Sequence, residues 1–208
     1  MMVRRAVWIL AVAASWMAPM TVRAEENSFA SDRPLTMIER GILVEINDLL
    51  NARDFTAADQ RLREVIERNP ELLPARKMHA AVLISLNRYE EAIAILDAIT
   101  REFPSDHGAL NNLSWVLSTA TDQRFRNPAR ALQLAQDSVL IAPGDYHVWS
   151  TLAEAHLRNA NYDQAVKSMT LALDLAVRAQ AGADQLESYR EQMNAMQETA
   201  AIMSLMEQ

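Results

Sequence analysis

Residues 146–179 read YHVWSTLAEAHLRNANYDQAVKSMTLALDLAVRA, and their apolar pattern predicts two helices joined by a turn. Each half carries a stripe at intervals of three, four and seven residues: Trp149, Leu152, Ala153 and His156, then Tyr162, Ala165, Val166, Met169, Ala172 and Leu173. Residues 159–161 form the turn signal, with Asn161 as the expected N-cap. Alanines in both stripes allow helix axes to approach to the short end of the usual ~8–10 Å. Such a hairpin buries only one face of each helix, so it needs neighbours.

The same pattern recurs along the chain. Small residues mark the centre of a second helix at intervals of 34, 39 and 34 residues: Ala58, Ala92, Ala131 and Ala165. Ring residues precede three of these by three positions: Phe55, Tyr89 and Tyr162. Prolines follow three by twelve positions: Pro70, Pro104 and Pro143. The alanines and the prolines have the same 34-residue period, and both spacings lengthen to 39 residues between the second and third units. This agreement indicates an internal repeat.

The spacing resembles the tetratricopeptide repeat, a helix–turn–helix unit with a W-x2-L-G-x2-Y…A-x3-F…A…P pattern. In that register the repeats are 39–72, 73–106, 107–145 and 146–179, and the last matches best. The third has Pro128 in place of the turn aromatic, while Glu45 and His79 replace a leucine in the first two. The resemblance implies an all-α solenoid of about four repeats.

Five extra residues of the third repeat fall between Leu117 and Ala131, where they lengthen a turn. Such an extension costs little free energy, so it requires no functional reason. The turn carries Phe125 flanked by Arg124 and Arg126, an unusual group in an acidic chain. It has two interpretations: Phe125 packs against its own repeat, or the three residues form a docking loop for a partner.

A terminal helix follows the fourth repeat, after a break at Ala181-Gly182 within the segment 180–208. Its apolar stripe contains Leu186, Tyr189, Met193, Met196, Ala200 and Met203. Solenoids need a helix to cover their last exposed face, which predicts a capping helix. Because methionine-rich stripes adapt easily to different surfaces, a homodimer seam or a site for a partner helix within 183–208 is the alternative.

Residues 1–24 have the pattern of a signal peptide, with a basic start and an apolar run over 6–18. This run is shorter than the ~20 residues of a spanning helix. Small residues before position 25 predict cleavage after Ala24, which would make the protein periplasmic or secreted with no membrane span. An uncleaved anchor and a cytoplasmic chain are the alternatives. Residues 25–38 are expected to form a flexible leader and a helix start.

Composition excludes several functional classes. The chain has no cysteine, so disulfides and thiol chemistry are absent. Removal of residues 1–24, with three arginines and no acid, lowers the net charge from −7 to −10, which disfavours nucleic acid as a partner. The four glycines are more than thirty residues apart and form no phosphate loop, and the four histidines include no i,i+4 pair. We therefore predict no enzyme, cofactor or metal; the methionine pairs that could suit copper also belong to the apolar stripe of the terminal helix.

The resemblance places a partner-binding groove on the concave side, which the first helices line. At groove positions the sequence has amides, an aromatic ring and charges of both signs: Asn47, Lys77, Asn111, Trp115, Ser150, Glu154 and Arg158. The pattern departs from the family's carboxylate clamp, whose basic positions hold Leu43 and Gly108 here. Trp115 could equally be a core residue packed between repeats.

These observations predict a non-enzymatic adaptor of the cell envelope that holds a segment of another protein or peptide in the groove. The alternative is a structural subunit that self-associates, or joins an envelope complex, through the methionine-rich terminal helix.

Overall fold

The computed structural model describes residues 35–206, and all regular structure in that range is helical. It contains nine α-helices, labelled α2 to α10, and a short 3-10 helix, η1, with no strand between residues 35 and 206. The predicted signal peptide, 1–24, and the leader up to residue 34 lie outside the described residues. None of the described helices is long and apolar enough to cross a membrane.

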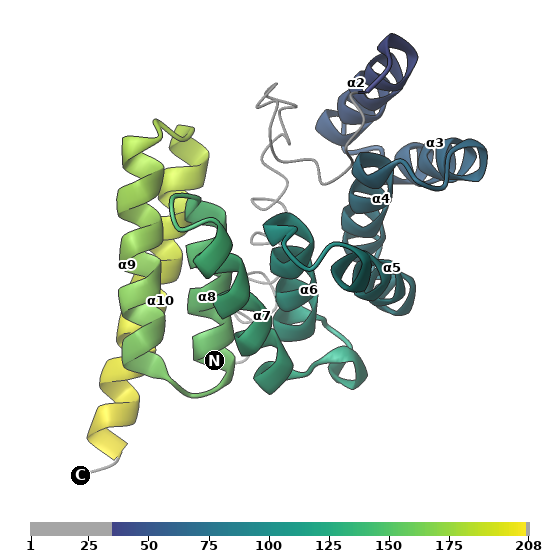
Figure 1. Cartoon of the computed structure of the whole chain (residues 1–208). Coiled ribbons are helices and arrows are strands. Elements are labelled where there is room, and N and C mark those ends of the chain that lie inside the picture. Colours follow the sequence, from purple (N-terminus) through teal and green to yellow (C-terminus); the bar gives the residue numbers. More distant parts are fainter. Residues whose placement is uncertain (1–34, 207–208) are drawn as a thin grey trace. The chain divides into compact units, whose positions relative to one another are not determined.

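The helices pair in chain order as hairpins (Figure 1). The pairs are α2 (Met37–Asn51) with α3 (Phe55–Arg68), α4 (Leu73–Ser85) with α5 (Tyr89–Glu102), α6 (His107–Thr119) with α7 (Pro128–Ile141), and α8 (Tyr146–Arg158) with α9 (Tyr162–Arg178). The last helix, α10 (Ala183–Met206), follows α9. The predicted all-α class with about four hairpins and a terminal helix is confirmed. The chain divides into two compact units, Met1–Ala109 (unit 1) and Leu110–Gln208 (unit 2), described separately below.

Four helix-to-helix turns share one backbone device. A non-glycine residue adopts the left-handed conformation in each, with φ between 55° and 59°: Arg53, Asn87, Ala160 and Gln180. The next N–H then donates to the carbonyl five residues earlier, as from Asn161 to His156 at 3.0 Å. This pattern satisfies carbonyls at the helix end that would otherwise lack partners. The α6–α7 turn is longer and contains η1 (Gln123–Phe125), where the sequence places its extra residues.

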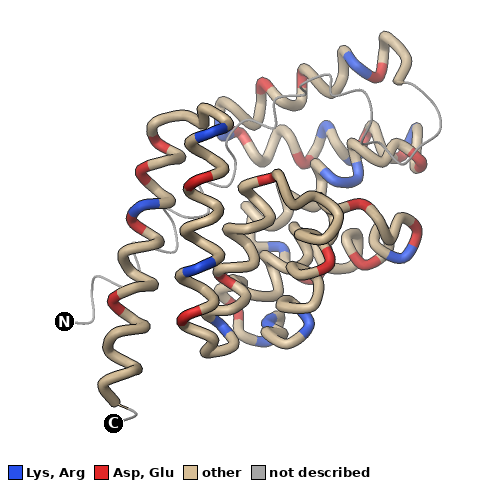
Figure 2. The backbone as a smooth tube through the Cα atoms, turned by 60° about the vertical axis from the view of Figure 1, so that its left-hand side comes forward, with Lys and Arg blue, Asp and Glu red and all other residues tan. Residues whose placement is uncertain are grey.

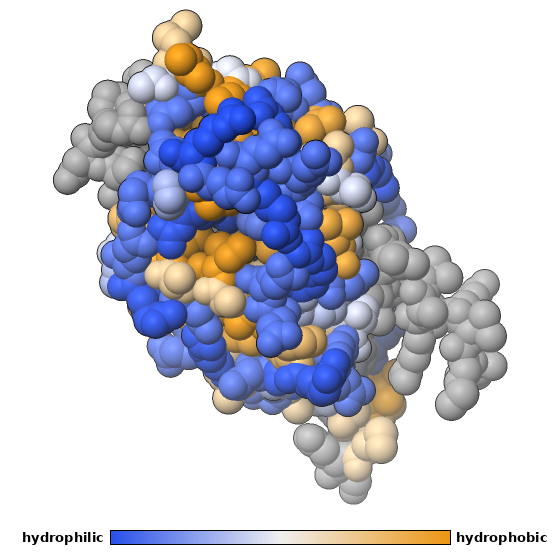
Figure 3. All heavy atoms as spheres, turned by 90° about the vertical axis from the view of Figure 1, so that its right-hand side faces the viewer, coloured by the Kyte–Doolittle hydropathy of each residue, from blue (hydrophilic) through white to orange (hydrophobic). Residues whose placement is uncertain are grey.

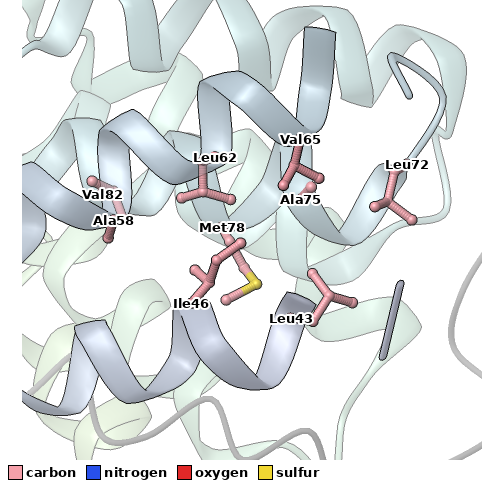
Figure 4. Close-up of a cluster of buried hydrophobic side chains, with 9 residues drawn as sticks. All are labelled: Leu43, Ile46, Ala58, Leu62, Val65, Leu72, Ala75, Met78 and Val82. Atoms are coloured by element: carbon pink, nitrogen blue, oxygen red, sulfur yellow. The ribbon is translucent and has the colours of Figure 1, made fainter. Parts of the chain in front are cut away.

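The core of unit 1 is aliphatic. Helices α2, α3 and α4, with the residue preceding α4, contribute Leu43, Ile46, Ala58, Leu62, Val65, Leu72, Ala75, Met78 and Val82 (Figure 4). Thr36 is the N-cap of α2 and forms a capping box: its side chain accepts from the Glu39 N–H, and the Glu39 carboxylate accepts from the Thr36 N–H. Burial of each large aliphatic side chain contributes ~1.5–3 kcal/mol, so this cluster holds the three helices together.

The core of unit 2 is built around small residues. Helices α8 and α9 contribute Ala153, Ala165, Met169, Ala172 and Ala176, and α10 adds Tyr189 and Met196. All four predicted crossing alanines, Ala58, Ala92, Ala131 and Ala165, are fully buried. The outer surface is mostly hydrophilic in the view of Figure 3, with apolar atoms exposed in separate patches.

Candidate protein-interaction surface

The predicted groove residues are distributed over both compact units. Unit 1 holds Asn47 on α2 and Lys77 on α4, whereas unit 2 holds Asn111 and Trp115 on α6 and the other three on α8. The geometry below is therefore given within each unit. Within unit 2 it brings one predicted pair, Glu154 and Arg158, into direct contact.

Lys77 is bonded within the chain. Its Nζ lies 2.8 Å from both carboxylate oxygens of Asp106, which is almost fully buried. Asp106 also accepts from the Ala109 N–H at 2.8 Å in the first turn of α6. A Cβ at Gly108 would lie 3.1 Å from Nζ, so the absent side chain gives the ammonium its space. Asn47 is half-buried, and its Oδ1 has no hydrogen-bond partner among the described residues.

Asn111 and Trp115 are four residues apart on α6, and both are buried. Trp115 is only 5% exposed, and the Asn111 Oδ1 has no hydrogen-bond partner in the part of the chain that the structure describes. Residues at this spacing share one face of a helix. Because Trp115 is almost fully buried, its ring packs against other side chains of the protein. A partner could contact the ring only if that packing changed.

Ser150 is covered by α10. Its Oγ donates to the His147 carbonyl at 2.8 Å and accepts from the Tyr189 O–H at 3.1 Å. The Tyr189 oxygen also lies 3.4 Å from His147 Nδ1, and the Tyr146 ring meets the Tyr189 ring edge-on at 6.0 Å. Burial raises the pKa of Tyr189 and lowers the pKa of His147, although Asp145 opposes the latter shift. Tyr189, His147 and Ser150 are therefore all neutral near pH 7.

Glu154 and Arg158 form an i,i+4 ion pair on α8. Arg158 Nη2 lies 2.6 Å and Nε 2.7 Å from the same oxygen of Glu154. The Glu154 side chain is mostly buried, while that of Arg158 is 38% exposed. Arg158 thus offers a guanidinium that an incoming carboxylate can contact at the surface.

The predicted docking loop is fixed by its own residues. Asp122 accepts from the Arg124 N–H at 3.0 Å and pairs with its guanidinium at 2.6 Å, and the latter hydrogen bond is the main cause of the lowered pKa of Asp122. The Arg124 Cζ lies 5.6 Å from the centroid of the half-buried Phe125 ring, within cation–π range. Arg126 Nε donates to the Ala120 carbonyl at 2.6 Å, which ties the loop to the end of α6.

A cluster that sequence reasoning missed joins three helices of unit 1. The Asp59 carboxylate accepts from His79 Nε2 at 2.7 Å, from Arg88 Nη1 at 2.6 Å and from Arg63 Nε at 3.2 Å. Arg63 and Arg88 both also pair with Glu91. We call Asp59, Arg63, His79, Arg88 and Glu91 the Asp59 cluster. In the sequence, the one indication of this cluster is His79, a polar residue at a position where the repeat pattern has leucine.

The cluster determines which of its members carry charge. Burial raises the pKa of Asp59, but hydrogen bonds from His79 and Arg63 and the charges of Arg63 and Arg88 outweigh it, so the pKa is lowered overall. Burial lowers the pKa of His79 and outweighs the opposing effect of Asp59. Near pH 7 the cluster therefore holds ionised Asp59 and neutral His79. Within residues 35–206, no group of three or more His, Asp or Glu side chains is placed to hold a metal ion.

Helical hairpins that follow one another along the chain are typical of a helical-repeat protein. Two family models, each described as tetratricopeptide repeat, match residues 49–114 and 146–176, that is, from the end of α2 into α6 and over α8 and most of α9. The chain therefore contains tetratricopeptide repeats. Members of this family are scaffolds for protein–protein interaction and are generally non-catalytic.

Two curated proteins are similar to parts of the chain. Cellulose synthase operon protein C of Komagataeibacter xylinus is 29% identical over 145 residues, which are 69% of this chain and 11% of that protein. Phagocyte signaling-impaired protein of Drosophila pseudoobscura pseudoobscura is 26% identical over 117 residues, 56% of this chain and 12% of that protein. The chain thus matches about a tenth of the length of these relatives.

Solved structures share the fold. TTC0263, a thermophilic TPR protein of Thermus thermophilus, superimposes with a TM-score of 0.58 at 16% identity and covers 74% of this chain and 90% of its own. MamA residues 41-end from Desulfovibrio magneticus RS-1 give 0.54 at 17% identity, covering 76% and 93%.

Proposed function

We propose that the chain is a non-enzymatic adaptor of the cell envelope that binds a segment of a partner protein along the first helices of its repeats. The observation that carries this proposal is the presence of repeats of a scaffold family in which this side of each repeat receives the partner. The mixture of amides, an aromatic ring and charges at those positions suits an extended peptide with both polar and apolar side chains.

Within unit 2, we propose Arg158 as the first contact. It is the predicted groove residue there with substantial side-chain exposure, and its ion pair with Glu154 can be exchanged for one with a partner carboxylate. Ser150 and Lys77 are engaged in bonds within the chain, so their contribution requires those bonds to open. Asn111 and Trp115 would take part once the partner displaces their covering side chains.

Affinity capture from an envelope extract, with quantified partner binding, tests this site. Arg158→Ala should weaken capture by about tenfold, because charged contacts at interface centres often cost ~1–2 kcal/mol when truncated. The matched control is Arg178→Ala, which removes another i,i+4 ion pair, with Asp174 on α9, away from the groove positions. Equal capture by the two variants contradicts the proposal for Arg158.

Trp115 needs a second measurement, because its ring is buried. If it is a packing residue, Trp115→Ala destabilises the fold by ~3–5 kcal/mol. If it serves the partner, Trp115→Ala and Asn111→Ala leave the melting temperature nearly unchanged and weaken capture. Unchanged capture by a well-folded double variant ends the groove proposal at this position.

Export is a separate part of the proposal and rests on residues 1–24. N-terminal sequencing of the protein from an envelope fraction should give Glu25 as the first residue. A protein that still carries Trp8 contradicts cleavage, and recovery in the cytosol contradicts the envelope location.

Self-association through 183–208 is the second candidate function. It is favoured by the exposed apolar side chains at the end of α10, which include Ile202, Leu205 and Met206. The loop at Arg124, Phe125 and Arg126 is a further docking candidate, with Arg124 its most exposed cation.

A further inference from the structure

Helix α10 covers one side of the α8–α9 hairpin, and the two fit each other closely. The surface that it covers is lined by buried alanines, and we call it the alanine-lined surface: Ala153, Ala165, Ala172 and Ala176. Tyr189 and Met196 of α10 pack against it and are only 1% and 3% exposed. The Tyr189 hydroxyl also donates to the Ser150 hydroxyl on α8 at 3.1 Å. The structure therefore shows which helix fits the alanine-lined surface.

One short turn joins α9 to α10, and the two helices run side by side (Figures 1 and 2). Ala179 keeps right-handed helical dihedral angles, with φ −76° and ψ −1°, and α10 begins at Ala183. The chain therefore leaves the helical path only over residues 180–182. Gln180 adopts the left-handed conformation there, with φ 55°, which is unfavourable for a residue that has a side chain. A change of dihedral angles at these residues would join α9 and α10 into one continuous helix.

The α9–α10 turn is the least reinforced of the four turns that contain a left-handed residue. In each of the other three, a side chain of the turn forms a hydrogen bond with a neighbouring group: Asp54, Asn87 and Asn159. Gln180, by contrast, makes no side-chain hydrogen bond with any residue between 35 and 206. Alanine and glutamine are good helix formers, so Gly182 is the one residue of 179–183 that opposes a continuous helix. Only backbone hydrogen bonds and the packing of α10 hold the bend.

We infer that two copies of this chain exchange α10: the α9–α10 turn straightens, and α10 of each copy packs on the alanine-lined surface of the other. Exchange of an identical element reproduces between copies the contacts already made within one copy, so it requires no new complementary surface. Tyr189 of each copy then completes the core of unit 2 in the other, with the same hydrogen bond to Ser150. The left-handed conformation at Gln180 is relieved in the straightened turn. The exchange rests on self-association through 183–208, the second candidate function, and is independent of the groove.

The balance between the closed monomer and the exchanged dimer depends on concentration. The short turn holds each α10 beside its own hairpin at a high effective concentration, so monomer should predominate at low micromolar concentration. Exchange also requires α10 to leave its surface, which exposes Tyr189 and Met196 to water. Dimer should therefore accumulate slowly at several hundred micromolar and persist for hours after dilution. Sedimentation velocity of the full chain, before and after dilution, measures both species, and immediate dissociation on dilution contradicts exchange.

Two substitutions at the turn move this balance in opposite directions. Gly182→Ala favours a helix through the turn in both copies and should raise the association constant of the dimer roughly 5–30-fold. An added Cβ at Gly182 meets no atom within 4 Å, and its φ is not positive, so alanine also fits the closed turn. Ala183→Pro should lower the constant at least about tenfold, because proline fits the first residue of α10 but breaks a helix that continues through it.

The matched control is Gly144→Ala in the turn between α7 and α8. An added Cβ there also meets nothing within 4 Å, and φ is again not positive. This substitution should leave the association constant unchanged. Equal effects of Gly182→Ala and Gly144→Ala, or a dimer that Ala183→Pro leaves intact, overturn exchange through a straightened turn.

A single thiol in each chain shows which copy supplies α10, because the chain has no cysteine. The Thr170 hydroxyl on α9 lies 3.8 Å from the Met193 sulfur on α10, so the two side chains face each other. Thr170→Cys and Met193→Cys are prepared as separate chains, mixed, incubated at several hundred micromolar and mildly oxidised. Exchange should give a covalent dimer that joins the two variants, identified by mass spectrometry. In the control mixture Gln164→Cys, at an exposed position of α9, replaces Thr170→Cys and should give far less covalent dimer.

Each other outcome overturns the exchange in a distinguishable way. A monomer at every concentration overturns exchange together with self-association. A dimer whose two thiols form no more disulfide than the control mixture retains self-association but removes the exchange of α10. Continuous growth into larger oligomers overturns the closed pair of copies.

Discussion

The two units use different polar chemistry where a hairpin meets the helix that follows it. In unit 1 the Asp59 cluster links α3, α4 and the start of α5 through an ionised carboxylate, two guanidinium groups and a histidine. In unit 2 the corresponding junction of α8 with α10 is a neutral hydrogen bond between Tyr189 and Ser150. The cores differ likewise, since unit 1 packs leucine, isoleucine and valine, whereas unit 2 packs alanines around Tyr189 and methionines.

A hairpin and the helix that follows it can therefore be joined either by a charged cluster or by a neutral hydrogen bond. In unit 2 the core formed by α8, α9 and α10 consists mainly of alanines, and Tyr189 is its largest buried side chain. The aliphatic core of unit 1 spreads its stability over many residues, and its charged cluster makes the junction sensitive to pH. Four changes test this contrast.

The largest effect is expected from Tyr189→Ala. Tyr189 is the largest of the fully buried side chains, so its loss should lower the free energy of unfolding by ~3–5 kcal/mol. Urea unfolding followed by circular dichroism measures the loss. Leu62→Ala in the aliphatic core should cost a comparable ~2–5 kcal/mol, and a loss below ~1 kcal/mol at Tyr189 would show that α10 is dispensable for unit 2.

A smaller effect is expected from Asp59→Asn. The change removes the charge that Arg63, Arg88 and His79 share and leaves the shape of the side chain intact. Because the cluster is partly exposed, we expect a loss of ~1–3 kcal/mol. Urea unfolding at low and high salt measures it, with Asp174→Asn on the exposed face of α9 as the control. Equal losses for the two would contradict a structural role for the cluster.

Tyr189→Phe separates the hydrogen bond of unit 2 from its packing. The ring stays in place while Ser150 loses its donor, so the loss should be only ~0.5–1.5 kcal/mol. The same unfolding assay compares it with Tyr189→Ala. Similar values for the two substitutions would mean that the hydroxyl, and not the ring, holds the junction.

The smallest effect is expected from His79→Leu, and it depends on pH. The pKa of His79 is lowered from 6.5 in the folded chain, so below that pH the unfolded state binds a proton more readily and stability falls. His147 and His156 act in the same direction. Unfolding at pH 7.5, 6.0 and 5.0 should therefore show a shallower fall for His79→Leu than for the unchanged chain. Parallel curves would remove His79 from the pH response.

Local signals predicted the fold, and distant contacts decided the details of the site. The four alanines at the helix crossings are buried because their spacing sets which helix face they occupy. Asn161 is the N-cap residue of α9, but its side chain makes no capping bond and lies 3.5 Å from His156 instead. The repeat register predicts Lys77 and Ser150 in the groove. In the structure, however, Lys77 pairs with Asp106, 29 positions later, and Ser150 accepts a hydrogen bond from Tyr189, 39 positions later. No repeat register specifies those partners.

The spacing of these contacts also sets an order of assembly during synthesis. Arg88, the partner of Asp59, is synthesised 29 residues after it, and Tyr189, the partner of Ser150, is synthesised 39 residues after Ser150. Domains form from the N-terminal side as the chain grows, so the unit 1 junction can close while unit 2 is still incomplete. The alanine-lined surface of α8 and α9 stays open until α10 is made. Truncation before Tyr189 would therefore leave the alanine-lined surface of α8 and α9 without the side chains that cover it.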